Sequence, residues 1–258
     1  MKNKNKIIIT IILLIGLIAI YYYFKDEKIE VLKEYSSSGK LIGTNEYYLR
    51  KGDTILHGKF INYNKDGIKI AEGNFVNGHI KGKCLYYYDD GELESICHRK
   101  DSKITEEITE FYPNGKVKRY IMFDPFGLEA FIVRFDDQGI MKNYEGYSIM
   151  EIYQYPIAHK ERFNIKEEQY LKVGDTLKHS YLVANIPNAK RSFTIENVGI
   201  DNAKVKRITK KNEPCQIDVK EVLTKKGKNT IRSIVKYEFN DKVTPVFTDT
   251  LSFDVDVN

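Results

Sequence analysis

The chain has 258 residues, of which 42% are hydrophobic and 30% charged, and its formal net charge is +5. With 19 tyrosines, this composition indicates a folded chain of one or two domains and excludes a long disordered polymer. Its lysines and arginines are dispersed and no nucleic-acid-binding motif accompanies them, so we expect no nucleic acid partner.

The N-terminus has the pattern of a membrane anchor. Residues 7–24 carry no charge, follow three lysines within residues 1–6 and end in Tyr21, Tyr22, Tyr23 and Phe24. As a helix this segment spans ~27 Å, close to the ~30 Å hydrocarbon core of a bilayer. Because basic flanks stay in the cytoplasm, we expect a cytoplasmic basic tail at residues 1–6. The prediction is a single-pass protein of the cytoplasmic (inner) membrane whose C-terminal part is periplasmic or extracellular.

A cleaved secretory signal peptide is the alternative for the same segment. Such a peptide ends in small residues of the A-x-A type, and this run ends in Ala19, Ile20 and the three tyrosines. We therefore favour an uncleaved signal anchor at residues 7–24. Both interpretations export the rest of the chain.

A glycine-closed aromatic unit recurs five times after the anchor. The units end in glycines separated by 28, 24, 24 and 24 residues, with an aromatic residue four positions before each. Asp or Asn precedes three of these glycines, which predicts two-residue type I′ hairpin turns. A fixed period of this length indicates stacked supersecondary units, here an antiparallel ladder of β-hairpins. The turn glycines are Gly39, Gly67, Gly91, Gly115 and Gly139.

The segment from Glu72 to Gly91, EGNFVNGHIKGKCLYYYDDG, resembles MORN-type repeats, and most closely the bacterial variant often labelled YwqK-family antitoxin repeats. The resemblance covers residues ~30–147, and we assign residues 25–147 to this repeat domain. It implies an elongated ladder of hairpins that serves as a scaffold or interaction surface. It does not imply a catalytic centre.

Two pairs of residues in the middle of the ladder are candidates for specific roles. Tyr86, Tyr87 and Tyr88 cannot all face inward because strand side chains alternate, so we expect Tyr86 and Tyr88 to form an interaction surface. If Asp90 and Gly91 form a two-residue turn, the two residue numbers in each cross-strand pair add up to 181. This register places Cys84 opposite Cys97. Cross-strand neighbours approach closely enough for a disulfide, and export permits oxidation.

No residue pattern in the chain indicates catalysis. None of the five histidines has metal-ligand spacing, and no nucleophile motif or phosphate-binding glycine loop is present. We therefore predict no catalytic residue, no metal and no cofactor, and we expect that the protein is not an enzyme.

After the repeats, residues 148–170 have the composition of a linker that includes a possible short helix. Residues 171–258 contain short alternating segments separated by turn signals, which predicts a β-sandwich, and its general architecture resembles immunoglobulin-like modules. The predicted fold is thus mainly β, with a transmembrane helix, a MORN-like ladder and a sandwich.

The sequence predicts a membrane-anchored, exported scaffold or binding protein of the bacterial cell envelope, whose partner is a protein or an envelope polymer. The alternative is an antitoxin-like or immunity protein that neutralises a partner toxin.

Overall fold

The computed structural model describes residues 13–17, 28–155, 171–241 and 243–258. These residues are mostly antiparallel β-strands, which confirms the prediction of a mainly β chain. Residues 13–17 are helical, and within the described residues no helix has both the length and the apolar character needed to span a bilayer. The predicted basic tail, residues 1–6, and most of the predicted anchor, residues 7–24, lie outside the described residues.

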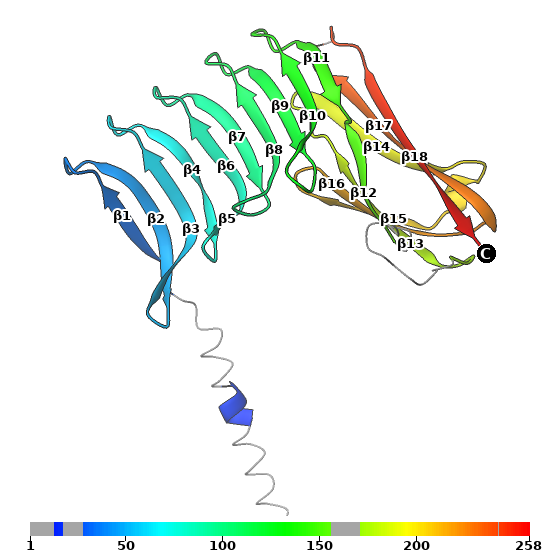
Figure 1. Cartoon of the computed structure of the whole chain (residues 1–258), viewed down its shortest axis with the longest axis horizontal. Helices are drawn as coiled ribbons and strands as arrows, with labels where there is room; N and C mark the ends of the chain where they lie inside the picture. The colour runs from blue at the N-terminus through cyan, green and yellow to red at the C-terminus, as the bar shows by residue number, and fades with distance from the viewer. Residues whose placement is uncertain (1–12, 18–27, 156–170, 242) are drawn as a thin grey trace, which may run out of the picture.

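The repeat region forms one long curved sheet, and Figure 1 shows its strands side by side from β1 to β11. Each strand pairs with the next along the chain, apart from the short β5, which pairs with β4. The strands are β1 (Glu30–Tyr35), β2 (Leu41–Arg50), β3 (Asp53–Tyr63), β4 (Lys69–Val76), β5 (His79–Ile80), β6 (Gly82–Tyr87), β7 (Leu93–Arg99), β8 (Thr105–Phe111), β9 (Val117–Phe123), β10 (Glu129–Phe135) and β11 (Met141–Gly146).

The turns at the repeat glycines differ from the predicted type. Tyr88 and Glu92 close a three-residue loop in which the Gly91 N–H donates to the Tyr88 carbonyl, 2.9 Å. Gly91 has a φ of 91°, whereas Asp90 has no positive φ, so the predicted type I′ turn is wrong here. A loop of this length ends in a left-handed residue, and glycine adopts that conformation without steric cost. Two-residue turns with two positive φ values occur at the opposite rim, at Lys51-Gly52 and Asn77-Gly78.

The ladder has two faces of different character. One face holds Tyr120, Phe131 and Val133, which are fully buried, and we call it the sandwich face. Because strand side chains alternate between faces, the aromatic residue of each repeat lies on this face too. The opposite face, called the open face, carries Phe60, Cys84, Cys97 and Ile108. A small core forms among these four residues, so the ladder buries apolar side chains on both sides of a single sheet.

The C-terminal part is a sandwich of two sheets. One sheet has the order β12 (Ile149–Tyr155), β13 (Thr176–Val183), β16 (Gln216–Val222), β15 (Arg207–Asn212), and the other has the order β14 (Ala189–Asn197), β17 (Gly227–Phe239), β18 (Phe247–Val257). A 3-10 helix, η1 (Asn202–Lys204), precedes β15. Taken in chain order, this is the A-B-E-D and C-F-G arrangement of a constant-type immunoglobulin sandwich.

The sandwich begins earlier in the chain than the sequence predicted. Residues 149–155, which we assigned to a linker, form β12 and pair with β13. Ile149 is 2% exposed. Burial of this apolar side chain favours a strand here, although the segment that follows has a polar composition. The remainder of the predicted linker, residues 156–170, lies outside the described residues.

The ladder and the sandwich share one hydrophobic core. Met122 and Phe131 of the ladder lie in the same buried cluster as Tyr181 and Val235 of the sandwich. Phe131 stacks on Phe247 with ring centroids 6.2 Å apart. The sandwich therefore covers the face of the last repeats that carries Met122 and Phe131.

Candidate functional site

Each glycine turn is followed by a register shift that adds one residue to the returning strand. Glu110 pairs with Arg119 but Phe111 pairs with Val117, so Lys118 has no partner across the hairpin. The added residue stands three positions after the turn glycine in every repeat. These residues are Ile42, Ile70, Glu94, Lys118 and Lys142. A bulge of this kind re-aims a side chain, and here Glu94, Lys118 and Lys142 line hollows on the open face.

The last two repeats place positive charge at these bulges. Lys118 and Arg119 follow the fourth turn glycine, and Lys142 follows the fifth. Arg119 lies directly opposite Arg134 in the pairing of β9 with β10. Like charges directly opposite each other destabilise a sheet, so this pairing is costly unless anionic groups compensate for it.

Two carboxylates partly compensate for the four cations. The Arg119 guanidinium donates to both oxygens of Glu110, at 3.2 and 2.5 Å, and this pair raises the pKa of Arg119. Arg134 Nη2 lies 2.6 Å from Glu145 Oε1. Among the described residues, the ammonium groups of Lys118 and Lys142 have no ion-pair partner within 4.0 Å.

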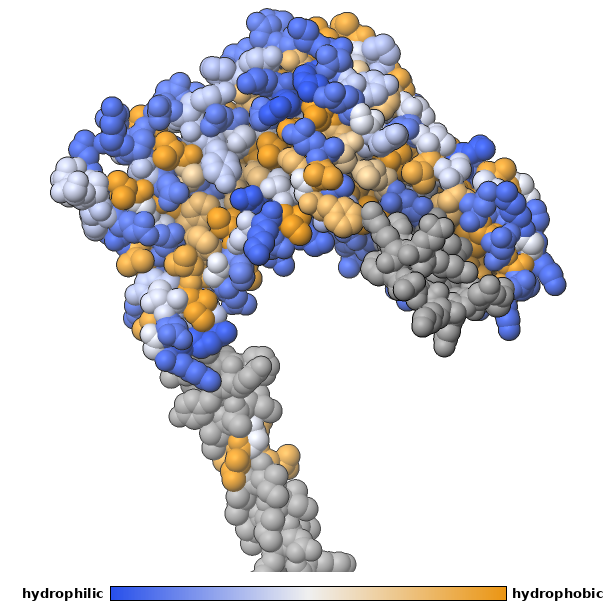
Figure 2. Space-filling view, in the orientation of Figure 1, coloured by the Kyte–Doolittle hydropathy of each residue, from blue (hydrophilic) through white to orange (hydrophobic). Residues whose placement is uncertain are grey.

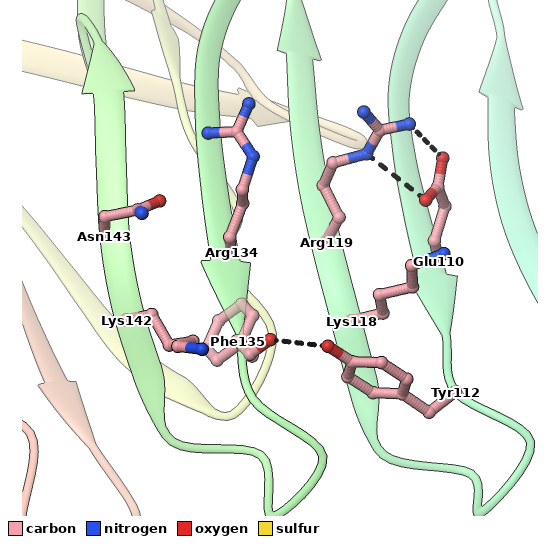
Figure 3. A pocket seen from close by; sticks show the side chains of 8 residues that line it. All are labelled: Glu110, Tyr112, Lys118, Arg119, Arg134, Phe135, Lys142 and Asn143. Atoms are coloured by element: carbon pink, nitrogen blue, oxygen red, sulfur yellow. Dashed lines mark hydrogen bonds and ion pairs between the residues drawn. The ribbon is translucent and has the colours of Figure 1, made fainter.

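These side chains line a hollow of about 440 Å³ on the open face. Figure 3 shows Arg119 turned toward Glu110 and away from Arg134, with β8 to β11 side by side beneath them. Tyr112 closes one end, where its hydroxyl donates to the Phe135 carbonyl oxygen, 3.0 Å. We call this hollow, lined by Glu110, Lys118, Arg119, Arg134, Lys142 and Asn143, the basic groove.

Tyr86 and Tyr88, predicted as an interaction surface, line an adjoining hollow of about 300 Å³. This hollow shares Glu110 and Lys118 with the basic groove, so the two are continuous along the open face. Both tyrosines are half-buried, and the Tyr88 hydroxyl donates to the Phe111 carbonyl oxygen of the next hairpin, 2.8 Å. An interaction role for these tyrosines stays a prediction.

Cys84 and Cys97 lie directly opposite each other in β6 and β7. The predicted register is therefore observed, although the turn that produces it has three residues plus a bulge instead of two residues. Both cysteines are buried free thiols, and burial raises the pKa of each. The disulfide between them stays a prediction. Cys215 is buried in the core shared with the sandwich.

The hairpin loops that hold the five turn glycines lie along one rim of the ladder in Figure 1, and Figure 2 shows hydrophilic residues there with hydrophobic ones between them. All five have φ between 76° and 91°. Their role in the structure is to close the hairpins and set the register of the strands that carry the basic groove.

Two buried polar clusters lie away from the groove. In the sandwich, Glu221 accepts from Arg207 Nε at 2.7 Å and from Asn197 Nδ2 at 3.3 Å. His179 is 1% exposed beside them, and burial lowers its pKa to about 3, so it stays neutral. At the boundary with the ladder, Glu107 accepts from the Tyr120 hydroxyl, 3.0 Å. Within the described residues, no group of His, Cys, Asp and Glu has the arrangement of a metal site.

Sequence reasoning did not identify the basic groove. Lys118 and Arg119 are adjacent, but Arg134 and Lys142 lie on two other strands, and the four belong to no motif. One signal was present, namely that the residue three positions after each turn glycine becomes lysine in the last two units. Its meaning depends on the bulges, which the sequence-based turn assignment did not include.

Comparisons with known proteins identify the repeats. A family model described as MORN repeat variant matches residues 80–101 and 107–124, which contain most of β6 to β9. No curated protein matches the sequence. Among solved structures, the crystal structure of TarM is similar with a TM-score of 0.22 and 10% identity, over 50% of this chain and 21% of that one. This chain thus spans about a fifth of the length of the TarM chain.

Proposed function

Because the chain is a MORN-type repeat protein, we propose that it is a non-enzymatic binding scaffold that uses the open face of its ladder to hold a partner. The observation that carries this proposal is the pair of continuous hollows on the open face of β6 to β11. The sandwich packs on the other face of β8 to β11, and Lys118, Lys142 and Asn143 of the groove are exposed.

We further propose that residues 7–24 anchor the protein in the cytoplasmic membrane and that the ladder and sandwich lie on its outer side. The support comes from the sequence alone: an uncharged run of bilayer length, a basic tail before it and aromatic residues at its end. A bacterial envelope scaffold is the function that combines these features.

Protease treatment of intact cells, or of spheroplasts where an outer membrane blocks access, tests the topology. The expected result is degradation of the chain after Lys25 without lysis. Full protection until the cytoplasmic membrane is opened would contradict the proposed orientation.

Site-specific photo-crosslinking tests the binding surface. A photoreactive residue at Asn143, in the basic groove, is expected to give a discrete adduct in cells. The matched control is the same residue at Lys228, an exposed position on the sandwich. Adducts of equal yield and identity from both positions, or none from Asn143, would count against the open face as the binding surface.

A further inference from the structure

We propose that the basic groove is a binding site for a phosphate-type oxyanion. The proposal rests on the proposed function, because it names the chemistry of a ligand for the same face of the ladder. It follows from the charge balance, the cross-strand pairing and the bulge geometry of β8 to β11.

The charge balance favours a dianion. Four cationic side chains line the groove, and the carboxylates of Glu110 and Glu145 neutralise two of them. Within the basic groove an excess of two positive charges remains, carried by Lys118 and Lys142, which project from equivalent bulges of consecutive repeats, and Glu94 adds one negative charge only in the adjoining hollow. A phosphate monoester carries close to two negative charges at neutral pH.

The pairing of Arg119 with Arg134 points to the same ligand. Adjacent strands lie ~4.8 Å apart, so the two guanidinium groups can contact one oxyanion placed between them once Arg119 turns from Glu110 toward Arg134. Figure 3 shows both arginines extending toward the same end of neighbouring strands, with the Arg119 guanidinium turned toward Glu110. The planar guanidinium fork matches phosphate oxygens in a bidentate manner, and the two flanking ammonium groups supply further donors.

The other repeats show that these cations are not a requirement of the fold. The same bulge position holds isoleucine at residues 42 and 70 and glutamate at residue 94. The bulge thus tolerates apolar and acidic side chains, and lysine occurs only where Arg119 and Arg134 lie beside it. This also means that substitutions at Lys118 and Lys142 are expected to leave the hairpins intact.

The test is a titration of the full chain, in a neutral detergent, with inorganic phosphate at constant ionic strength, followed by calorimetry. We expect saturable binding by the wild type and a loss of at least tenfold in affinity in the double variant Lys118→Gln/Lys142→Gln. The matched control, Lys210→Gln/Lys211→Gln, removes the same charge from two exposed lysines of β15 and is expected to change the affinity less than twofold. Melting temperatures within a few degrees of the wild type establish that both variants fold.

A parallel titration with short-chain polyphosphate distinguishes the source of the phosphate. Much tighter binding of the polymer per phosphate indicates a polyanionic chain as the ligand, and equal affinity indicates a small phosphate ester. Either result supports an oxyanion site. No saturation by either ligand, equal loss of affinity in both double variants, or equal competition by chloride would overturn the proposal.

The titration and the crosslinking experiment distinguish failure of the oxyanion site from failure of the proposed scaffold function. If phosphate fails to bind but the Asn143 crosslink persists, the open face is a binding surface with different chemistry. If phosphate binds but no crosslinked partner forms, the anion site stands and the scaffold proposal fails.

Discussion

Cys84 and Cys97 are predicted to form a disulfide under oxidising conditions. Directly opposite residues of an antiparallel pair have Cα atoms ~4.5 or ~5.5 Å apart, and both values lie within disulfide range. Because burial raises the pKa of both thiols, thiolate is scarce at neutral pH and oxidation by a small disulfide should be faster at alkaline pH. Thiol titration of the oxidised, denatured chain is expected to find one thiol, that of Cys215.

The double variant Cys84→Ser/Cys97→Ser is the control for this experiment and should show one thiol before and after oxidation. Three titratable thiols in the oxidised wild type would show that the pair does not bridge.

The tyrosine hydroxyls of the open face are predicted to connect successive hairpins. Tyr88→Phe removes the donor to the Phe111 carbonyl and leaves that half-buried oxygen without its partner. The expected cost is about 1 kcal/mol of unfolding free energy, measured by urea denaturation. Tyr35→Phe, at a position 57% exposed, is the control and should change stability by less than half that amount. Equal effects of the two substitutions would assign the loss to something other than the hydrogen bond.

At the scale of the strands, Glu72 links three of them on the sandwich face and makes the ladder sensitive to acid. Its carboxylate accepts from Lys69 at 2.6 Å and from the Tyr87 hydroxyl at 2.5 Å, and lies 2.9 Å from Lys59 Nζ. The hydrogen bonds from Lys69, Tyr87 and Lys59 lower the pKa of Glu72 to about 2. Its stabilising contribution is therefore present above the ordinary glutamate pKa and is lost as the pH falls toward 2.

Glu72→Gln is expected to reduce the loss of stability between about pH 4.5 and pH 2, which follows from the folded and unfolded pKa values. Urea midpoints measured across this range give the comparison. Glu92→Gln, at an exposed position next to the third turn glycine, is the control. An unchanged slope in the Glu72 variant would show that this carboxylate does not contribute to the acid sensitivity of the ladder.

The strand pattern of the ladder was predictable because it depends on a local signal repeated at a fixed period. The partnership of Cys84 with Cys97 also followed from sequence, but for an incomplete reason. A three-residue loop alone would shift the partner by one residue, and the bulge at Glu94 restores it. The predicted loop was one residue too short and the bulge was not predicted, and these two errors cancelled in the register. The side chain that the bulge adds at Glu94 was therefore missed.

The candidate site and the joint between the two parts were not predictable in the same way. The basic groove is assembled across four strands whose side-chain directions depend on bulges. Strand β12 was missed because its burial depends on β13, about 25 residues further along the chain. Such contacts are set by tertiary packing, which a local pattern does not contain.

At the scale of the whole molecule, the joint between ladder and sandwich is predicted to make them unfold together. Tyr120 is fully buried there; its hydroxyl donates to Glu107, and the backbone N–H of Asn185 donates to it at 2.7 Å. Burial, and then the Glu107 carboxylate, raise the pKa of Tyr120 well above its ordinary value, so the hydroxyl stays protonated and remains a donor. Tyr120→Phe leaves a buried carboxylate and a backbone N–H without this partner, at a cost of about 2–3 kcal/mol.

Hydrogen exchange followed by mass spectrometry measures this coupling, because it reports the protection of residues 30–146 and 171–258 separately. In the wild type we expect the slowest amides of the two parts to exchange with similar free energies, since the shared core opens as a unit. Tyr120→Phe should lower protection on both sides of the joint. Tyr112→Phe, which loses a hydrogen bond within the ladder, should lower it in the ladder alone. If Tyr120→Phe instead affects only the ladder, then the two parts are independent domains in contact, and the sandwich does not help to hold the open face in its binding geometry.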